Sequence, residues 1–111
     1  MTASQQPRAG EHLVSTVGSL SNDYITLAAG PALPAGQVLA QDATTKEFAA
    51  YDNAAATLGK AVAVLYAPQS VRTAPTRAVA TRRLAEVSGA GLTGLDDAAT
   101  ANLAEQHIIV R

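Results

Sequence analysis

The side chains that commonly carry out acid–base or metal chemistry are few in this chain and widely separated. His12 and His107, the two histidines, lie near opposite ends of the 111 residues without the carboxylate spacing of a metal motif. We expect both to be surface or packing residues. Asp96 and Asp97 are adjacent carboxylates, but neighbours at a helix start do not face each other, and the helix dipole accounts for them. They therefore indicate a helix N-terminus rather than a catalytic pair.

The sequence also lacks the loop motifs of nucleophilic or phosphate chemistry. Gly89, Gly91 and Gly94 have the spacing of a phosphate loop, but the Lys-Ser/Thr that should follow is missing. Five of the serines lack the glycine-flanked elbow of a hydrolase nucleophile and have no suitably placed histidine. They are Ser15, Ser19, Ser21, Ser70 and Ser88. The sequence predicts a protein that is not an enzyme and uses no metal or cofactor.

Half of the 8 basic residues gather in one segment: Arg72, Arg77, Arg82 and Arg83. No aromatic residue lies among them, so nucleic-acid bases have nothing to stack on. The net charge of −1 provides no general attraction to nucleic acid or to an anionic membrane. We expect these arginines to form the rim of a protein interface, with no direct nucleic-acid or membrane partner.

Alanine dominates the apolar composition, with 25 of the 111 residues, whereas Leu, Ile, Val and Phe together supply 24. A core with so few large side chains buries little surface, and small domains with this shortfall often associate with copies of themselves or with a larger body. Cysteine is absent, so no disulfide compensates. We expect one domain that forms an oligomer.

The N-terminal segment predicts a flexible arm over residues 1–20. Residues 1–10 are polar and without periodicity, so nothing there can anchor itself in a core. Glu11–Val17 carries β-branched residues with weak alternation, and turn-forming residues follow. We predict that this stretch forms a strand only against a partner. The start of the chain has no secretory signal, which predicts synthesis and retention in the cytoplasm.

The middle of the chain predicts a series of short strands. Tyr24–Ala28 alternates apolar and polar residues, the pattern of a half-buried strand. Val38–Ala40 and Glu47–Tyr51 flank a polar turn and predict a hairpin. Ala61–Tyr66 is apolar throughout and predicts a central strand buried on both faces. Further short strands are predicted at Ala78–Thr81 and Leu84–Val87.

The C-terminal part predicts the one helix of the chain, followed by a strand. A helix is predicted from Asp96 to about Gln106, and Leu95, Ala99 and Leu103 fall four apart, as on one helix face. Thr93 and Asp96 have the spacing of a capping box, although Gly94 lies between them. Ile108–Arg111 predicts a short apolar strand that must be paired, because an exposed apolar edge is a liability.

Several of these motifs, taken in order, resemble the head decoration protein family of tailed bacteriophages, the group that includes the lambda-type head protein. The resemblance covers roughly residues 12–111, and no single motif carries it. The matching segments are Ile25-Thr-Leu, Leu33-Pro-Ala-Gly-Gln-Val-Leu39, Asp42, Tyr51-Asp52, Gly59-Lys-Ala-Val-Ala-Val-Leu-Tyr66, Arg83-Leu-Ala-Glu-Val87 and the closing Ile108-Ile-Val-Arg.

The resemblance implies an α+β, mostly β fold, a compact strand-rich domain over residues 21–111 with one C-terminal helix, similar to a β-tulip. It implies homotrimers at local threefold sites on the outer surface of the expanded head, where they stabilise the major capsid protein lattice against internal DNA pressure. The arm would contact the capsid protein, and the residues expected to do so are Leu13, Val14, Ser15, Thr16 and Val17. Family members often have an acid after the arginine where this chain has Leu84, so we expect altered contacts there.

A hypothesis of a different class is a small β-rich carrier or ligand-binding module of the lipoyl type. Its basis is the set of strand pairs joined by Pro-Ala-Gly and the position of Lys60 just before a strand. Lys60 is not at a hairpin tip between Asp or Met neighbours, which argues against this reading. An adduct on Lys46 or Lys60 would support it.

Overall fold

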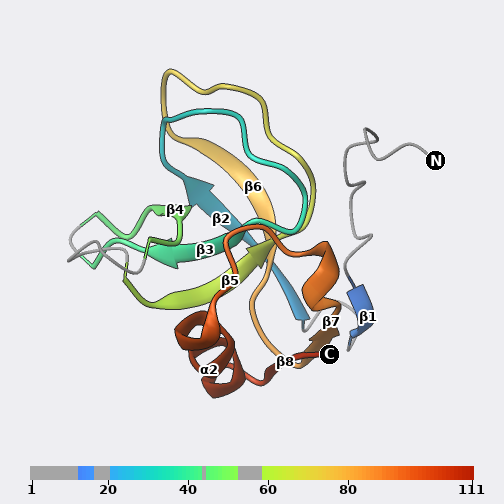
Figure 1. Ribbon diagram of the computed structural model, residues 1–111. Helices are drawn as coiled ribbons and strands as arrows, with labels where there is room; N and C mark the ends of the chain where they lie inside the picture. Colours follow the sequence, from blue (N-terminus) through green and yellow to red (C-terminus); the bar gives the residue numbers. More distant parts are fainter. Residues whose placement is uncertain (1–12, 17–20, 44, 53–58) are drawn as a thin grey trace.

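Strands dominate the fold, as the sequence predicts (Figure 1). A computed structural model describes residues 13–16, 21–43, 45–52 and 59–111. Within them the chain forms a closed five-stranded barrel and a separate three-stranded sheet, with a single α-helix near the C-terminus. The predicted α+β, mostly β single domain with one C-terminal helix is therefore confirmed.

The barrel has the strand order β2-β4-β3-β5-β6. Its longest ladder joins β2 and β6 antiparallel, from Asn22 opposite Thr81 to Leu27 opposite Thr76. The barrel closes where β2 and β4 run parallel, with Leu27 opposite Phe48. Its strands are β2 (Asn22–Leu27), β3 (Val38–Gln41), β4 (Phe48–Ala50), β5 (Ala61–Leu65) and β6 (Thr76–Thr81).

The second sheet brings the two ends of the described chain together. Its central strand is β7 (Ala85–Val87), which pairs antiparallel with β1 (Leu13–Thr16) and parallel with β8 (Ile108–Val110). A bulge interrupts the β1–β7 register between Leu13 and Ser15. Between β7 and β8 the chain forms the 3-10 turn η1 (Gly89–Gly91) and the helix α2 (Asp97–Glu105).

Two hydrophobic clusters hold these parts together. The first includes Ile25, Leu27, Leu39, Phe48 and Leu65 and fills the barrel. The second lies where the barrel meets α2 and the small sheet, and it comprises Val38, Ala40, Tyr51, Ala61, Val64, Val87, Ala99, Leu103 and Ile108. Strands β3 and β5 contribute to both clusters, which explains why their sequences are apolar at nearly every position. The prediction of a central strand buried on both faces is confirmed for β5, in which all residues but the half-buried Val62 are buried.

The alternation in β2 and the predicted hairpin also appear in the fold. Ile25 and Leu27 point into the barrel and are buried, whereas Tyr24 and Thr26 are exposed. Strands β3 and β4 form the antiparallel hairpin, with Leu39 opposite Ala50. Many barrel positions are alanines, such as Ala63, Ala78 and Ala80. Small side chains suit the interior of so narrow a barrel, which explains why the core holds few large residues.

The helix forms where predicted, but its capping box does not. Asp96 itself is the N-cap: its Oδ1 accepts a hydrogen bond from the Ala99 backbone N–H at 2.7 Å. The Thr93–Asp96 box is wrong because Thr93 bridges to Gln37 and is therefore held in extended backbone, while Gly94 takes a positive φ of 83°. Ala99 and Leu103 are the buried residues of the helix, as the four-residue spacing predicts.

Two strand predictions need correction. The segment expected to form a strand only against a partner forms β1 against the chain's own β7, because Leu13 packs on the second hydrophobic cluster. Leu84 does not belong to the strand predicted over residues 84–87, since its φ of 53° is left-handed and incompatible with extended backbone. The predicted C-terminal strand is paired, and its first residue, Ile108, is fully buried.

Candidate functional site

The five residues expected to contact the capsid start at β1. Leu13 is half-buried against the second cluster, whereas Val14 is 54% exposed. Ser15 and Thr16 pair with Glu86 and Ala85 of β7, and Val17 lies outside the described residues. β1 is an edge strand of the small sheet, so its outer backbone groups are not used within the sheet. The four described residues of the predicted capsid contact, Leu13–Thr16, therefore all lie in β1.

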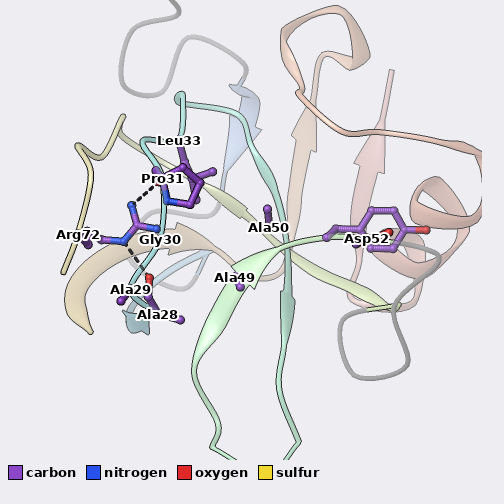
Figure 2. A pocket seen from close by; sticks show the side chains of 10 residues that line it. Ala28, Ala29, Gly30, Pro31, Leu33, Ala49, Ala50, Asp52 and Arg72 are labelled. Carbon is purple, nitrogen blue, oxygen red and sulfur yellow. Dashed lines mark hydrogen bonds between the residues drawn. The ribbon is translucent and has the colours of Figure 1, made fainter. Parts of the chain in front are cut away.

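The four predicted rim arginines do not form one group, and Arg72 stands apart from the others. Its Nε donates to the Ala28 carbonyl at 2.9 Å, and one terminal nitrogen donates to the Pro31 carbonyl at 3.1 Å (Figure 2). The same terminal nitrogen also donates to the Ser70 carbonyl at 3.0 Å. The backbones of Gly30 and Arg72 also bond to each other in both directions. Arg72 therefore joins the loop after β2 to the loop before β6, a role that the sequence alone did not indicate.

A surface pocket of about 440 Å³ lies beside this arginine. It is lined mostly by small apolar side chains, with Arg72 at one end and Asp52 at the other (Figure 2). The lining residues are Ala28, Ala29, Gly30, Pro31, Leu33, Ala49, Ala50, Tyr51, Asp52 and Arg72. The guanidinium faces backbone carbonyls, and among the described lining residues no cluster of polar side chains converges to fix a small ligand.

Arg77 lies on the outer surface of the barrel and stacks on Tyr24. The guanidinium carbon is 4.1 Å from the centre of the tyrosine ring, and the tyrosine is 67% exposed. Such a pair contributes modestly at an exposed site. It presents an aromatic and a cation together, a combination frequent among residues that dominate protein interfaces. Sequence analysis missed Tyr24, although its place on the polar face of β2 was the available signal.

Arg82 and Arg83 both contact Asp23 at the far end of β6. The Arg83 guanidinium donates to the Asp23 carboxylate at 2.6 Å, and that of Arg82 lies 3.6 Å from it. The hydrogen bond from Arg83, aided by its charge, lowers the pKa of Asp23 below the ordinary 3.8 and raises that of Arg83. Arg82 also lies over Phe48, at 5.2 Å from the ring centre. Together they cover one end of the barrel, with one positive charge in excess.

The lysines of the carrier hypothesis have ordinary positions. Lys60 precedes β5 and forms an ion pair with Glu105 of α2 at 3.0 Å, with both side chains largely exposed. Lys46 lies in the β3–β4 turn with a positive φ of 65°. His107 is exposed between α2 and β8, and His12 lies outside the described residues.

The described ranges contain neither a metal-binding cluster nor a helix that could span a membrane. No group of three or more His, Cys, Asp or Glu side chains there has metal-binding geometry. No helix among those residues has the length and apolar character needed to cross a membrane. The notable side chains instead form ion pairs, a cation–aromatic stack and exposed apolar surface. Exposed aromatic, cationic and apolar side chains are the kinds of residue frequent in the interfaces of structural proteins.

Comparison with known families agrees with that class. The family model described as bacteriophage lambda head decoration protein D matches residues 2–108 of the 111. The chain therefore belongs to this family of structural phage capsid proteins, and the resemblance predicted from sequence is confirmed. The family is not an enzyme family. Comparison with curated proteins returned no match.

Proposed function

We propose that this protein binds as a homotrimer at local threefold sites on the outer surface of the expanded phage head. There it stabilises the lattice of the major capsid protein against internal DNA pressure, after synthesis in the host cytoplasm. The observation that carries the proposal is the family match over residues 2–108, which supports capsid decoration over the carrier hypothesis.

The contact with the capsid protein is assigned to the arm, residues 1–20, with residues 21–111 as the decoration domain. The position of β1 supports this assignment, since an edge strand can leave or extend its sheet more easily than a central one. Strand addition to the capsid protein would gain about 0.5–1.5 kcal/mol for each backbone hydrogen bond. Leu13–Val17 is the segment proposed to add this strand, because it contains β-branched residues.

Trimer formation is supported by the small core. Alanines occupy many positions inside the barrel, so little large apolar surface is buried within one copy. Three arms on one trimer act together, and their high effective concentration converts weak single contacts into firm attachment. We propose that Arg77, Arg82 and Arg83 form the polar rim of an interface. Arg72 lies apart from them at the paired loops and could contribute to such a rim only there.

Co-sedimentation with expanded, undecorated heads of the parent phage tests the proposal. The full-length chain is compared with versions lacking residues 1–20 and residues 1–12, because the shorter deletion keeps β1. We expect saturable binding at three copies per threefold site, lost in the 1–20 deletion. Binding by the 1–12 deletion would assign the contact to Leu13–Val17, and its loss would assign it to the first residues.

Two results would contradict parts of this scheme. If the full-length protein does not bind expanded heads, the decoration function is wrong. If the 1–20 deletion binds as well as the full chain and remains folded by circular dichroism, the arm assignment is wrong and the decoration function stands. Sedimentation velocity of the free protein tests the trimer, and a monomer both in solution and on heads excludes it.

A further inference from the structure

A hollow lies on the outer wall of the barrel, where β2 and β6 run side by side (Figure 1). Its volume is about 350 Å³, and it is lined by Asn22, Asp23, Tyr24 and Val79. This volume is at the lower end of the usual range for ligand sites, about 300–1,000 Å³. The hollow therefore suits a small molecule or one unit of a longer chain.

Tyr24 is the wall of this hollow on which a ligand can stack. Its side chain is 67% exposed, and it lies directly opposite Val79 in the β2–β6 register. The Arg77 guanidinium carbon is 4.1 Å from the centre of the tyrosine ring, but Arg77 does not line the hollow. The arginine therefore steadies the ring from outside the hollow, and an exposed part of the ring borders it.

Two polar side chains at the start of β2 add complementary hydrogen-bonding groups. The buried Thr81 hydroxyl donates to Asn22 Oδ1 at 2.8 Å, and among the described residues nothing accepts from the Asn22 amide nitrogen. Arg83 and Arg82 contact Asp23 Oδ2, at 2.6 Å and 3.6 Å, and no described residue bonds to Asp23 Oδ1. The hydrogen bond from Arg83 lowers the pKa of Asp23, so its carboxylate is an ionised acceptor. The hollow thus offers one donor group and one acceptor beside an aromatic ring.

The charge at the hollow favours a neutral ligand. Arg83 already neutralises the Asp23 carboxylate, so a cationic ligand gains little there. The remaining oxygen, Oδ1, repels the oxygens of an anionic ligand such as a phosphate backbone. A sugar ring matches all three groups, because its C–H face packs on an aromatic ring and its hydroxyls both donate and accept.

We propose that this hollow binds a neutral saccharide, with Tyr24 as the stacking platform, Asn22 as hydrogen-bond donor and Asp23 as acceptor. The inference goes beyond the proposed capsid decoration and does not depend on it, because all four lining residues belong to one chain. β2 and β6 form the longest ladder of the barrel, so these groups are held in place before a ligand arrives. With few contacts, one site has a dissociation constant on the order of 1 mM. Copies arrayed on a head would together bind a glycan-bearing surface far more tightly.

The test is a titration of the purified, isotope-labelled, full-length protein, followed by NMR. The probes are the methyl glycosides of glucose, galactose and mannose, then N-acetylglucosamine, and a short oligothymidylate as the nucleic-acid comparison. We expect at least one saccharide to shift the amide signals of residues 22–24 and 79, with a dissociation constant of about 1 mM. The oligothymidylate should leave these signals unchanged.

Four variants test whether the saccharide binds in the hollow. Tyr24→Ala removes the platform and Val79→Phe fills the hollow with another strand-favouring residue, so each should weaken binding by about tenfold or more. Tyr24→Phe keeps the ring and should bind within about threefold of the wild type. Val71→Ala is the matched control, because Val71 is 70% exposed on the loop before β6 and does not line the hollow. Thermal melting checks that each variant is folded.

Several outcomes would overturn the inference, and none of them bears on the decoration function, because no heads are used. If no saccharide shifts these amides at about 50 mM, fifty times the expected constant, the hollow is not a saccharide site. If the oligothymidylate shifts them and the saccharides do not, the ligand class is wrong. If the folded Tyr24→Ala and Val79→Phe variants bind a saccharide as well as the wild type does, the saccharide binds elsewhere.

Two further results are also decisive. If the same amides shift with protein concentration alone, a second copy covers the hollow and the saccharide assignment is wrong. If Tyr24→Ala melts well below the wild type, Val79→Phe decides: lost binding supports the site, and unchanged binding refutes it.

Discussion

Asp96 shows how one side chain connects two parts of this fold. Its carboxylate caps α2 through the Ala99 backbone N–H at 2.7 Å and accepts the Tyr51 hydroxyl at 3.0 Å. Tyr51 follows β4 and belongs to the second hydrophobic cluster. The same carboxylate therefore fixes the start of the helix and its distance from the barrel.

We predict that Asp96→Ala lowers the free energy of unfolding by about 1–2 kcal/mol, the usual cost of losing an N-cap. Asp96→Asn should lose less, because an asparagine side chain also caps helices. Tyr51→Phe serves as the control, since it removes only the hydroxyl contact. Urea unfolding followed by circular dichroism measures all three, and an Asp96→Ala variant as stable as the wild type would contradict the assignment.

At the residue scale, sequence predicts what depends on near neighbours. Asp96 and Asp97 indicate a helix start because their effect is local. The left-handed backbone of Leu84 is held by a hydrogen bond from Ser21, which lies 63 positions earlier. No pattern in the residues near Leu84 predicts this conformation. The Arg83–Asp23 pair, 60 positions apart, is hidden for the same reason.

At the scale of elements, the paired loops depend on Arg72. Gly30 and Leu33 of the first loop bridge to Arg72 and Gln69 of the second, but these are isolated bridges rather than a ladder. The guanidinium adds hydrogen bonds to the Ala28 and Pro31 carbonyls across the same gap, and one to the Ser70 carbonyl of its own loop. A planar guanidinium reaches several acceptors at once, whereas the ammonium of a lysine does so less well.

Arg72→Lys should therefore loosen the loop pair while leaving the barrel folded. We expect faster hydrogen exchange at the amides of Gly30 and Leu33 and a loss of about 1–3 kcal/mol in unfolding free energy. Arg77→Lys is the matched control, because Arg77 stacks on an exposed ring and its loss should cost little. Exchange measured by mass spectrometry or NMR that is equal in the two variants would refute the role of Arg72.

Elements with a strong local pattern were predicted, and their arrangement was not. The β3–β4 hairpin and β5 follow from alternation, turn residues and a short apolar run. Barrel closure depends on the pairing of Leu27 in β2 with Phe48 in β4, and these strands are not consecutive in sequence. The periodicity of either strand alone therefore cannot predict it. The arginines were grouped by position along the chain, whereas the fold places Arg72 in the loop before β6, Arg77 within β6, and Arg82 and Arg83 just after it.

At the scale of the whole molecule, the two hydrophobic clusters share β3 and β5. If either the barrel or the helix with its small sheet loses its packing, apolar side chains of the other part become exposed. The molecule should therefore unfold as one cooperative unit.

Leu103→Ala tests this cooperativity from the helix side. Leu103 is fully buried in the second cluster, so its truncation should cost about 2–5 kcal/mol. The melting of the barrel, followed by hydrogen exchange of β2 and β6 amides, should move together with the helix signal at 222 nm. Separate transitions for helix and barrel would show that the clusters are independent.

The closed barrel has a further consequence for the behaviour of the free protein. A component of a repeating shell is made in many copies, and open sheet edges at high concentration act as templates for aggregation. In the barrel each strand has a neighbour on both sides, so among the described strands open edges occur only in the small sheet. Among the described strands, the fold thus confines the risk of uncontrolled polymerisation to the sheet that carries β1, and the capsid contact proposed for β1 would cover that edge.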